Sequence, residues 1–308
     1  MDFKHTTVLC KETIETLDIK PGELYIDCTS GGGGHSFEIA KKGGRLICFD
    51  VDANAIAACR ERVRGYQDVE LINANFADMA DYINTGAAGV LMDLGVSSHQ
   101  LDVAERGFSF HEDAPLDMRM SAVSETYSAF DVVNGYSEER LIKILYEYGE
   151  EKYAKGIVRG IIAARQAAPV ETTGQLAEII KRNVPLSVRN AKNPCRKTFQ
   201  AIRIEVNDEL GSLSRGLNAG FGILSHGGRL AVITFHSLED RLVKKQFSEW
   251  TAGCDCPKNL PLCVCGKLPS AIHITRKPIV PGASELNSNR RARSAKLRVV
   301  QKVIQEGE

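Results

Sequence analysis

The sequence predicts an α/β protein in which one sheet domain is interrupted by an all-helical insert. Apolar runs alternate with helical stretches over about the first hundred residues, and this alternation is typical of βαβ units that form a parallel sheet. Between about Ser98 and about Phe199 there are helix and loop patterns but no convincing strand, and the strand pattern then resumes. We therefore predict that residues 1–103 and 199–308 form the sheet domain and that residues 104–198 form the insert.

The predicted strands are short apolar runs, three of which end in aspartate. Before the insert they are Leu24–Asp27, Arg45–Asp50, Val69–Ala74 and Gly89–Asp93, and after it they are Leu230–Phe235 and Ala295–Gln301. Their high content of apolar residues is typical of parallel strands whose two faces are both covered by helices.

Helical periodicity accounts for most of the remaining chain. Helices are predicted over His35–Lys42, Ala53–Val63, Ser137–Tyr148, Glu151–Arg165 and Glu239–Trp250, and another opens at Thr172, which forms a capping-box pattern with Gln175. One long helix is predicted from an apolar stripe at helical spacing, made of Phe199, Ile202, Val206, Leu210, Leu213, Leu217 and Phe221. Residues 251–289 contain five prolines and are predicted to be loop.

The composition excludes several classes of protein. The 308 residues are 43% apolar, and lysine plus arginine balances aspartate plus glutamate at 39 each, so the chain can bury a core but is not basic throughout. The sequence contains no run of 18 apolar residues, so no membrane span is expected. Residues Met1–His5 do not begin the apolar segment that a secretory signal requires. The nine cysteines indicate thiols or metal ligands in a reducing compartment, so we expect a cytoplasmic protein with no membrane partner.

A glycine-rich segment marks the predicted cofactor site. Asp27–His35 contains four consecutive glycines between a strand and a helix, where glycine lets a ligand approach the backbone N–H groups of the helix N-terminus. Asp50 ends the next strand, a position from which an acid accepts hydrogen bonds from ribose hydroxyls. Phe76 is either an adenine contact or an ordinary core aromatic. These features predict a ligand that contains adenosine, whereas the alternative interpretation of the glycines is a flexible turn.

S-adenosylmethionine fits this segment better than a dinucleotide does. The pattern G-x-G-x-x-G fails because Ser36 occupies the third glycine position, and no phosphate-loop pattern is present. S-adenosylmethionine has no pyrophosphate, and its ammonium and sulfonium groups favour acids such as Asp27 and Asp93. Two alternatives stay open at this point, a nicotinamide-dependent oxidoreductase and an RNA-binding module with a vestigial pocket.

Two features near the C-terminus allow a functional and a structural interpretation. Nine basic residues and one acid lie between Lys267 and Lys302, which is typical of a phosphate-binding surface or simply of a solvated face. Four cysteines form two C-x-C pairs that could hold a structural zinc ion or remain a loop of free thiols, and these are Cys254, Cys256, Cys263 and Cys265.

Seven blocks of sequence together resemble one family. They are Asp27–His35, Asp93–Ser98, Arg106–Phe110, Leu116–Met120, Thr198–Ile204, Phe235–Arg241 and Arg293–Arg298. In this order they resemble the RsmH family, also called MraW, of bacterial methyltransferases that modify the N4 position of a cytosine in small-subunit ribosomal RNA. The resemblance covers essentially the whole chain and implies a Rossmann-like, S-adenosylmethionine-dependent core with an inserted helical domain that binds RNA.

The resemblance also implies roles for individual residues. The family's cofactor contacts fall on Gly33, Gly34, His35, Asp50, Phe76, Asp93 and Gln100. The implied reaction is a direct in-line transfer to cytosine 1402, in conventional numbering, of the decoding region of 16S ribosomal RNA. The substrate is either the free RNA or the small ribosomal subunit, and the sequence allows a homodimer as well as a monomer.

Asp93 is the residue that we expect to take part in the transfer. It opens the loop after the fourth predicted strand, where its carboxylate can accept a hydrogen bond from the target amine or anchor the methionine end of the donor. Ser97 is expected to add a hydrogen bond. The alternative for Asp93 is that it only caps the following turn.

Cys195 and His236 are the remaining residues that bear on the type of methyl transfer. Methylation at carbon 5 of the base needs a cysteine nucleophile, but Cys195 lies in the insert and not after the fourth strand, so we interpret it as structural. His236 either contacts the target base or holds a loop. Ser237 and Asp240 are predicted to cap the next helix.

Overall fold

The computed structural model divides into two compact units. It describes residues 7–84, 86–121, 127–190, 193–254, 256, 262 and 264–303. The sheet unit comprises Met1–Gly95 and Leu210–Glu308, and the helical unit comprises Val96–Glu209. No helix among the described residues is long and apolar enough to cross a membrane.

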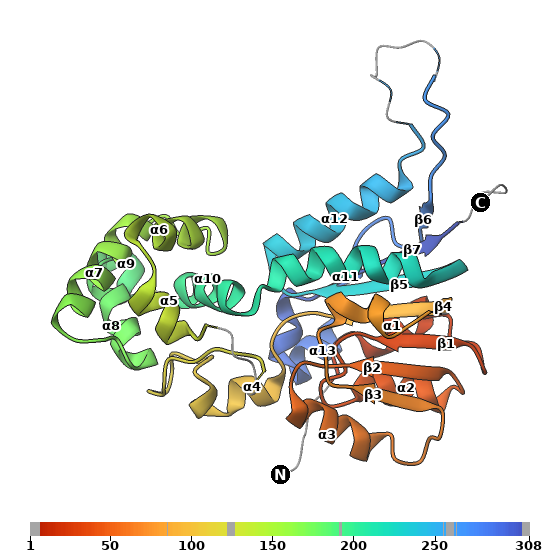
Figure 1. Cartoon of the computed structure of the whole chain (residues 1–308), viewed down its shortest axis with the longest axis horizontal. Coiled ribbons are helices and arrows are strands. Elements are labelled where there is room, and N and C mark those ends of the chain that lie inside the picture. The colour runs from red at the N-terminus through yellow and green to blue at the C-terminus, as the bar shows by residue number, and fades with distance from the viewer. Residues whose placement is uncertain are drawn as a thin grey trace. The chain divides into compact units, whose positions relative to one another are not determined.

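The sheet unit is built on seven strands in the order β3-β2-β1-β4-β5-β7-β6 (Figure 1). The strands are β1 (Leu24–Asp27), β2 (Arg45–Phe49), β3 (Val69–Ile72), β4 (Ala87–Asp93), β5 (Leu224–Thr234), β6 (Ala271–His273) and β7 (Lys296–Lys302). Strands β1 to β5 are parallel to one another. Strand β7 pairs antiparallel with both β5 and β6. The strand order reverses between β1 and β4, which is the position where open α/β sheets bind ligands.

Helices cover both faces of this sheet, as the apolar strands predict. They are α1 (Cys10–Leu17), α2 (Gly34–Lys41), α3 (Ala53–Arg62), η1 (Phe76–Asp81), α11 (Glu209–Ile223), α12 (Ser237–Thr251), α13 (Ala283–Ser288) and η3 (Arg290–Ser294). Side chains alternate along each strand: Val90 and Met92 pack with α11 and α12, whereas Leu91 between them packs with α1 and α2. The two cores hold the strands, and therefore the strand ends, in fixed register.

The helical unit has a core of its own. Its helices are α4 (Ser98–Asp102), η2 (Ala104–Arg106), α5 (Ala129–Gly135), α6 (Glu138–Glu147), α7 (Ala154–Ala167), α8 (Thr173–Arg182), α9 (Leu186–Arg189) and α10 (Arg196–Asn207). Fully buried side chains such as Leu141, Ile157 and Leu176 pack in one cluster. The capping box predicted at Thr172 and Gln175 is confirmed at the start of α8.

The long helix predicted from Phe199 to Phe221 is wrong, because the structure breaks it at Asp208. This residue has φ 45° and ψ 42°, a left-handed conformation that ends α10 as a C-cap. The apolar stripe consequently serves two cores: Phe199 and Ile202 are buried in the helical unit, whereas Leu213 and Leu217 are buried in the sheet unit.

The boundaries of the units lie at different residues from the predicted ones. The first falls after Gly95 instead of after residue 103, and the second falls before Leu210 instead of before residue 199. At the first boundary, the amide of Gln100 donates to Met120 O at 3.3 Å and so ties α4 to the helical unit. At the second, α10 contributes its buried face to the helical core.

Residues 251–289 are not entirely loop. Strand β6 pairs with β7 through Ala271 and Lys302, and α13 follows it. A strand of three residues at the edge of a sheet is too short to show the alternating pattern that identifies strands in a sequence.

The predicted capping pair Ser237–Asp240 is also wrong, because the cap lies one residue earlier. His236 and Glu239 form the capping box of α12. The Asp240 carboxylate is instead bound by Arg298 at 2.7 Å and by Lys296 at 2.9 Å. These two cations belong to the basic C-terminal stretch, so part of its charge is neutralised within the fold.

Asp240→Ala is expected to destabilise the sheet unit by about 2–3 kcal/mol, because it leaves the largely buried Arg298 guanidinium without its carboxylate. Burial acts to raise the pKa of Asp240, but hydrogen bonds from Arg298 and Lys296 outweigh it and lower the pKa. Urea unfolding measures the effect. Glu249→Ala is the matched control on the same helix, since its ion pair with Lys245 is exposed and should contribute below about 0.5 kcal/mol. If both variants lost the same free energy of unfolding, the Asp240–Arg298 ion pair would not have the stabilising role assigned to it.

Candidate active site

Three aspartates lie at the carboxyl edge of the parallel sheet. Asp27 and Asp93 are the last residues of the adjacent strands β1 and β4, and Asp50 directly follows β2. Because these strands are parallel neighbours in the order β2-β1-β4, their carboxyl ends meet at one edge. The structure thus brings together three acids that are up to 66 positions apart in the sequence.

The glycine-rich loop is fixed to the end of β2. Gly31 N–H donates to the Asp50 carboxylate at 2.9 Å, and Ser30 N–H donates to Phe49 O at 2.9 Å. Gly33 has φ +74°, and a Cβ atom there would lie 3.0 Å from Cα and Sγ of Cys59. Glycine at this position therefore allows a left-handed turn in close contact with α3. The loop ends at Gly34 and His35, the first residues of α2.

Asp50 is a partly satisfied carboxylate. Besides Gly31, the N–H of Asp52 donates to it at 2.9 Å. Burial raises the pKa of Asp50 to about 6, although these two backbone hydrogen bonds act to lower it. The group therefore changes from acid to carboxylate within the physiological range, and only the carboxylate accepts hydrogen bonds with both oxygens.

Asp27 is buried at this edge, and Asp93 beside it is partly buried. The Asp27 carboxylate accepts hydrogen bonds from Ser36 Oγ at 2.6 Å and Thr29 N–H at 3.2 Å, and burial raises its pKa to about 6. Burial also raises the pKa of Asp93 well above its ordinary value, and the charges of Asp27 and Glu239 add to this effect.

The Asp93 carboxyl has one oxygen without a partner. Its backbone N–H donates to Thr29 Oγ1 at 2.7 Å, which fixes the residue at the strand end, and Oδ2 lies 3.6 Å from His35 Nδ1. Oδ1 is buried and has no hydrogen-bond partner. Buried polar atoms are almost always satisfied, so an unsatisfied one at a strand end points to a ligand that donates a hydrogen bond or carries positive charge.

Three acids at one sheet edge, of which Asp27 is buried and the other two are partly buried, favour a cationic ligand. Each additional negative charge raises the cost of ionising the others, and a bound cation removes this cost. A pyrophosphate at this edge would add negative charge to the group. The electrostatics therefore agree with the sulfonium and ammonium groups predicted for the ligand and disagree with a dinucleotide.

His236 holds a loop in this structure. Its ring Nε2 lies 3.1 Å from Glu239 Oε1, and its Nδ1 accepts from Glu239 N–H at 3.5 Å. Glu239 in turn accepts from Phe235 N–H at 2.8 Å. Glu239 was not predicted as part of the site, although a glutamate three residues after the first residue of a helix cap is the signal that identifies such a pair.

Phe76 packs against a glycine of α11. A Cβ atom at Gly216 would lie 2.3 Å from the Phe76 ring, so only glycine leaves space for the aromatic side chain. The ring is partly exposed at the start of η1, just after β3. This position is compatible with both interpretations of the residue, adenine contact and core aromatic.

Ser97 and Gln100 lie in the helical unit and bind each other. Ser97 N–H donates to the Gln100 side-chain carbonyl at 2.9 Å, and Gln100 N–H donates to Ser97 Oγ at 3.2 Å. This reciprocal pair caps α4, a structural role that the sequence pattern S-x-x-Q already contains. Their predicted roles at the reaction centre stay predictions.

The cysteines outside the sheet edge have different environments. Cys195 is buried in the helical core, its Sγ lies 3.7 Å from Ala177 O, and burial raises its pKa to about 11, which disfavours a nucleophilic thiolate. Cys254, Cys256 and Cys265 lie together after α12, whereas Cys263 lies outside the described residues.

The sequence matches the MraW methylase family over residues 2–303. The chain belongs to this family. The family resemblance inferred from the sequence blocks is thereby confirmed, and so is the Rossmann-like methyltransferase fold of the sheet unit. Membership makes the protein a methyltransferase.

Relatives in the family match the chain over its full length. A protein of Symbiobacterium thermophilum is 53% identical, with 100% of this chain and 99% of its own covered. Proteins of Clostridium botulinum strain Kyoto and Clostridioides difficile strain 630 are 50% and 49% identical, each with 98% of this chain and 100% of their own covered. All three are called ribosomal RNA small subunit methyltransferase H. Among solved structures, an rRNA methylase of Streptococcus thermophilus aligns with 97% of this chain and 98% of its own at a TM-score of 0.45 and 10% identity.

Proposed function

We propose that this protein transfers a methyl group from S-adenosylmethionine to the N4 amine of cytosine 1402 in 16S ribosomal RNA. The names of its relatives support the class of substrate. The observation that carries the chemistry is the Asp93 carboxyl, whose buried Oδ1 has no hydrogen-bond partner at the sheet edge where the strand order reverses. We place the reaction in the cytoplasm, where the ribosomal RNA is assembled with its proteins.

The residues at the sheet edge fit the proposed donor. Asp50 would accept hydrogen bonds from the ribose hydroxyls, and the backbone of Gly33, Gly34 and His35 would line the methionine side of the site. Phe76 would contact the adenine. Gln100 is proposed as a further contact of the donor. The donor, when bound, contributes a methyl group on a positively charged sulfur, whose charge the acids at this edge offset.

Asp93 is proposed to act on the target amine. The lone pair of a cytosine amine is delocalised into the ring, so a hydrogen bond from the amine to Asp93 Oδ1 localises electron density on the nitrogen. The nitrogen–carbon bond then forms as the carbon–sulfur bond breaks in line, sulfur keeps the electron pair, and the amine loses one proton. Because the pKa of Asp93 is raised by burial, its carboxylate can hold that proton.

The alternative chemistries lack the groups that they require. Transfer to carbon 5 needs a thiolate beside the base, and Cys195 is buried in the helical core, where burial raises its pKa to about 11 and disfavours the thiolate. A dinucleotide would bring a pyrophosphate to an edge that already holds three acids. An RNA-binding module would not need the buried and unsatisfied Asp93 oxygen.

The decisive experiment maps the methylated atom. The purified protein is incubated with labelled S-adenosylmethionine and either naked 16S ribosomal RNA or isolated small subunits from cells that lack the protein. Mass spectrometry of nuclease fragments then locates the modification. The proposal expects N4-methylcytidine at position 1402, whereas 5-methylcytidine, another position or no incorporation into either substrate would contradict it.

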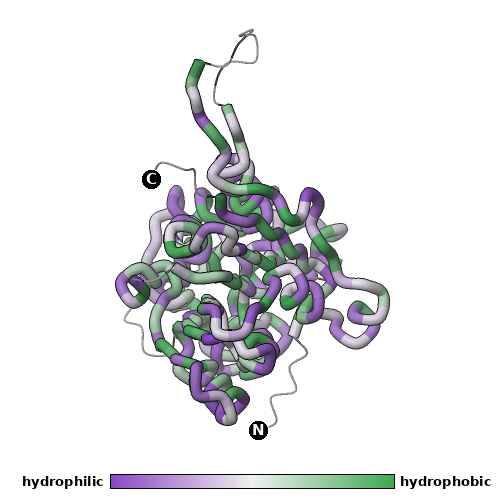
Figure 2. Tube along the Cα trace, turned by 90° about the vertical axis from the view of Figure 1, so that its right-hand side faces the viewer, coloured by the Kyte–Doolittle hydropathy of each residue, from purple (hydrophilic) through white to green (hydrophobic). Residues whose placement is uncertain are grey.

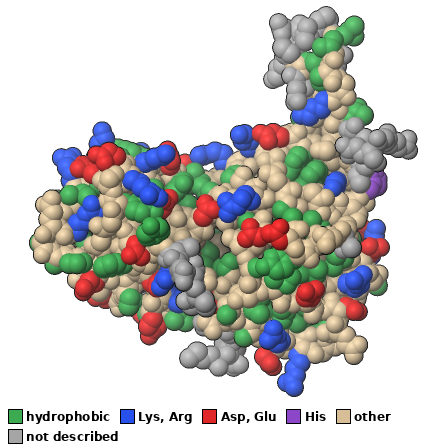
Figure 3. All heavy atoms as spheres, in the orientation of Figure 1, with side chains coloured by type: hydrophobic (Ala, Val, Ile, Leu, Met, Phe, Trp, Pro, Cys, Tyr) green, Lys and Arg blue, Asp and Glu red, His purple; other side chains and the backbone are tan. Residues whose placement is uncertain are grey.

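RNA binding is proposed for a basic surface of the helical unit. Between Lys181 and Lys197 the sequence has six lysines and arginines and no acid. Arg182, Arg189 and Arg196 are exposed at the ends of α8, α9 and the start of α10. On the face shown in Figure 3, acidic and basic side chains are interspersed. A segment that carries only positive charge, on a protein with no net charge, is a suitable contact for the phosphate backbone of RNA.

Reversing two of these charges should weaken RNA binding in a salt-dependent way. Arg182→Glu combined with Arg196→Glu is expected to lower affinity for a 16S fragment at least about tenfold and to reduce the salt slope by about two. Fluorescence anisotropy at several salt concentrations measures both. Lys143→Glu with Lys152→Glu makes the same charge change on exposed residues elsewhere in the unit. If this control weakens binding as much, the basic surface is not the interface.

A further inference from the structure

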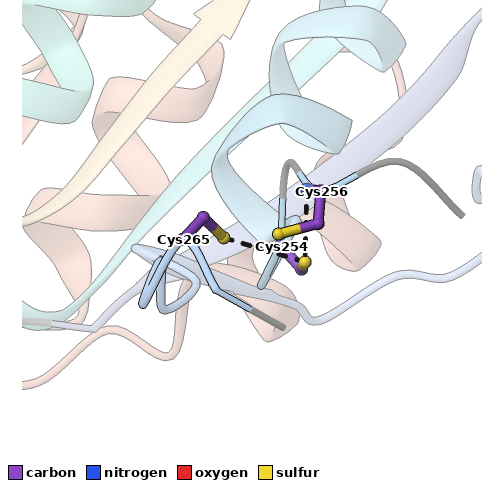
Figure 4. A group of neighbouring side chains, drawn as sticks. All are labelled: Cys254, Cys256 and Cys265. Atoms are coloured by element: carbon purple, nitrogen blue, oxygen red, sulfur yellow. Dashed lines mark hydrogen bonds between the residues drawn. The ribbon is translucent and has the colours of Figure 1, made fainter. Parts of the chain in front are cut away.

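Three thiols gather in the segment that joins α12 to β6. We call residues 252–270 the arm. Its described residues extend away from the sheet unit (Figure 1), and they include Cys254, Cys256 and Cys265. The three Sγ atoms lie within 4.8 Å of one another (Figure 4). Cys265 Sγ and Cys254 Sγ are 3.7 Å apart. The arm thus brings together cysteines from both C-x-C pairs, although they are separated by up to eleven positions.

The separation of two of the sulfurs, which are placed as a thiol–thiol hydrogen bond, is also compatible with a shared metal ion. A disulfide requires sulfurs about 2.05 Å apart. Two thiolates bound to one tetrahedral zinc ion at about 2.3 Å lie about 3.8 Å apart, which follows from the tetrahedral angle. The separation of Cys254 and Cys265 agrees with the second value and excludes a disulfide between them in this structure.

Backbone N–H groups are directed at two of the sulfurs. Cys256 N–H donates to Cys254 Sγ at 3.3 Å, and Val264 N–H donates to Cys256 Sγ at 3.5 Å. Hydrogen bonds of this kind stabilise negative charge on sulfur and orient it, which is the usual arrangement around a metal-bound thiolate.

We propose that the arm binds one structural zinc ion through these three thiolates. Three thiolates provide most of a tetrahedral zinc shell. Zinc is favoured over harder cations because each of these three ligands is a soft sulfur.

The position of the thiols separates the metal from the methyl transfer. Helix α12 begins next to His236 at the sheet edge and ends at Thr251, and its 15 residues span about 22 Å. The arm starts at the far end of this helix. The proposal is consequently independent of the methyltransferase function, and either can fail without the other.

A bound metal would stabilise the conformation of the arm, which has little buried apolar surface to do so. Leu262, Val264 and Leu268 are 77%, 79% and 60% exposed, so they contribute no core, and Figure 2 shows hydrophobic residues along this projection. At its base the arm is closed by Ser270 N–H, which donates to Trp250 O at 2.9 Å. A zinc ion would link the two sides of the arm at a second point and hold its apolar residues in one conformation.

Metal analysis of the whole protein tests the site. Protein purified with a reductant should contain about one zinc per chain, and cobalt(II) added after metal removal should give the absorption of a tetrahedral thiolate complex. Cys254→Ser and Cys265→Ser should each lose the zinc and become sensitive to trypsin at Lys267. Cys10→Ser, which changes a cysteine outside the arm, should keep both the zinc and the resistance. Circular dichroism confirms that each variant is folded.

Several outcomes would overturn the proposal. A wild-type zinc content near zero together with no tetrahedral cobalt spectrum excludes the site. Visible absorption of an iron–sulfur cluster assigns the thiols to another cofactor. A disulfide between these cysteines that persists in protein purified with a reductant, detected by mass spectrometry, assigns them to a covalent bond. Zinc retained in both Cys254→Ser and Cys265→Ser would place it elsewhere in the chain.

Discussion

Asp93→Ala is expected to lower the rate of methyl transfer by about 10²–10³-fold, because it removes the acceptor proposed to hold the target amine. The rate is measured under single-turnover conditions with small subunits and labelled S-adenosylmethionine. Folding should not suffer. The Asp93 carboxyl has a raised pKa, caused by its burial and by the charges of Asp27 and Glu239, so its removal relieves repulsion at the sheet edge.

Two further variants make this result specific. Asp93→Asn keeps the shape of the side chain but loses its charge and its ability to take up a proton, so it should be nearly as slow as Asp93→Ala. Asp68→Asn makes the same change at an exposed acid beside β3 and should leave the rate unchanged. If Asp93→Ala incorporated methyl groups at the wild-type rate with an unaltered unfolding free energy, Asp93 would have no role in the transfer.

The affinity for S-adenosylmethionine is expected to fall about tenfold between pH 7.5 and pH 5, because burial raises the pKa of Asp50 to about 6. Below this pKa the carboxyl is protonated and can no longer accept two hydrogen bonds from ribose hydroxyls. At pH 5 about one tenth of the molecules carry the charged form. Isothermal titration calorimetry at the two pH values measures the change.

Asp50→Asn identifies the group responsible. The variant should bind the donor about 10–100-fold more weakly at pH 7.5, since hydrogen bonds to a charged group contribute about 1.5–3 kcal/mol. It should also lose the part of the pH dependence that comes from Asp50, while Asp27, whose pKa burial raises to about 6 as well, keeps its own part. Acid unfolding does not explain the effect. A carboxyl with a raised pKa contributes stability that is present at low pH and lost as the pH rises towards 6, which is the opposite sign. Wild-type affinity that is equal at both pH values would contradict the proposed ribose contact.

The strands and the acids at their ends could be predicted because both depend on local sequence. An apolar run that ends in aspartate, followed by glycines or a tight turn, identifies Asp27, Asp50 and Asp93 without any knowledge of tertiary contacts. Their approach at one edge then follows from the geometry of a parallel sheet.

The features that were missed depend on contacts between distant residues or on single torsion angles. The apolar stripe through Phe199 and Leu217 continues at helical spacing, so periodicity cannot reveal the left-handed Asp208 within it. The partners of Asp240 are nearly sixty positions away on β7. Glu239 was missed for a different reason, because the capping pattern was assigned to Ser237 and Asp240 although His236 and Glu239 have the same spacing.

The position of the helical unit within the chain determines the order in which the protein can be completed during synthesis. Residues 96–209 are contiguous and carry their own core, so this part can fold as soon as it has left the ribosome. Strand β4, by contrast, ends at Asp93, and it cannot pair with β5 until the residues from Leu224 onward have been synthesised. Until those residues are made, β4 has an unpaired edge, and newly made chains stay exposed to wrong pairing at that edge until the last third of the sequence arrives.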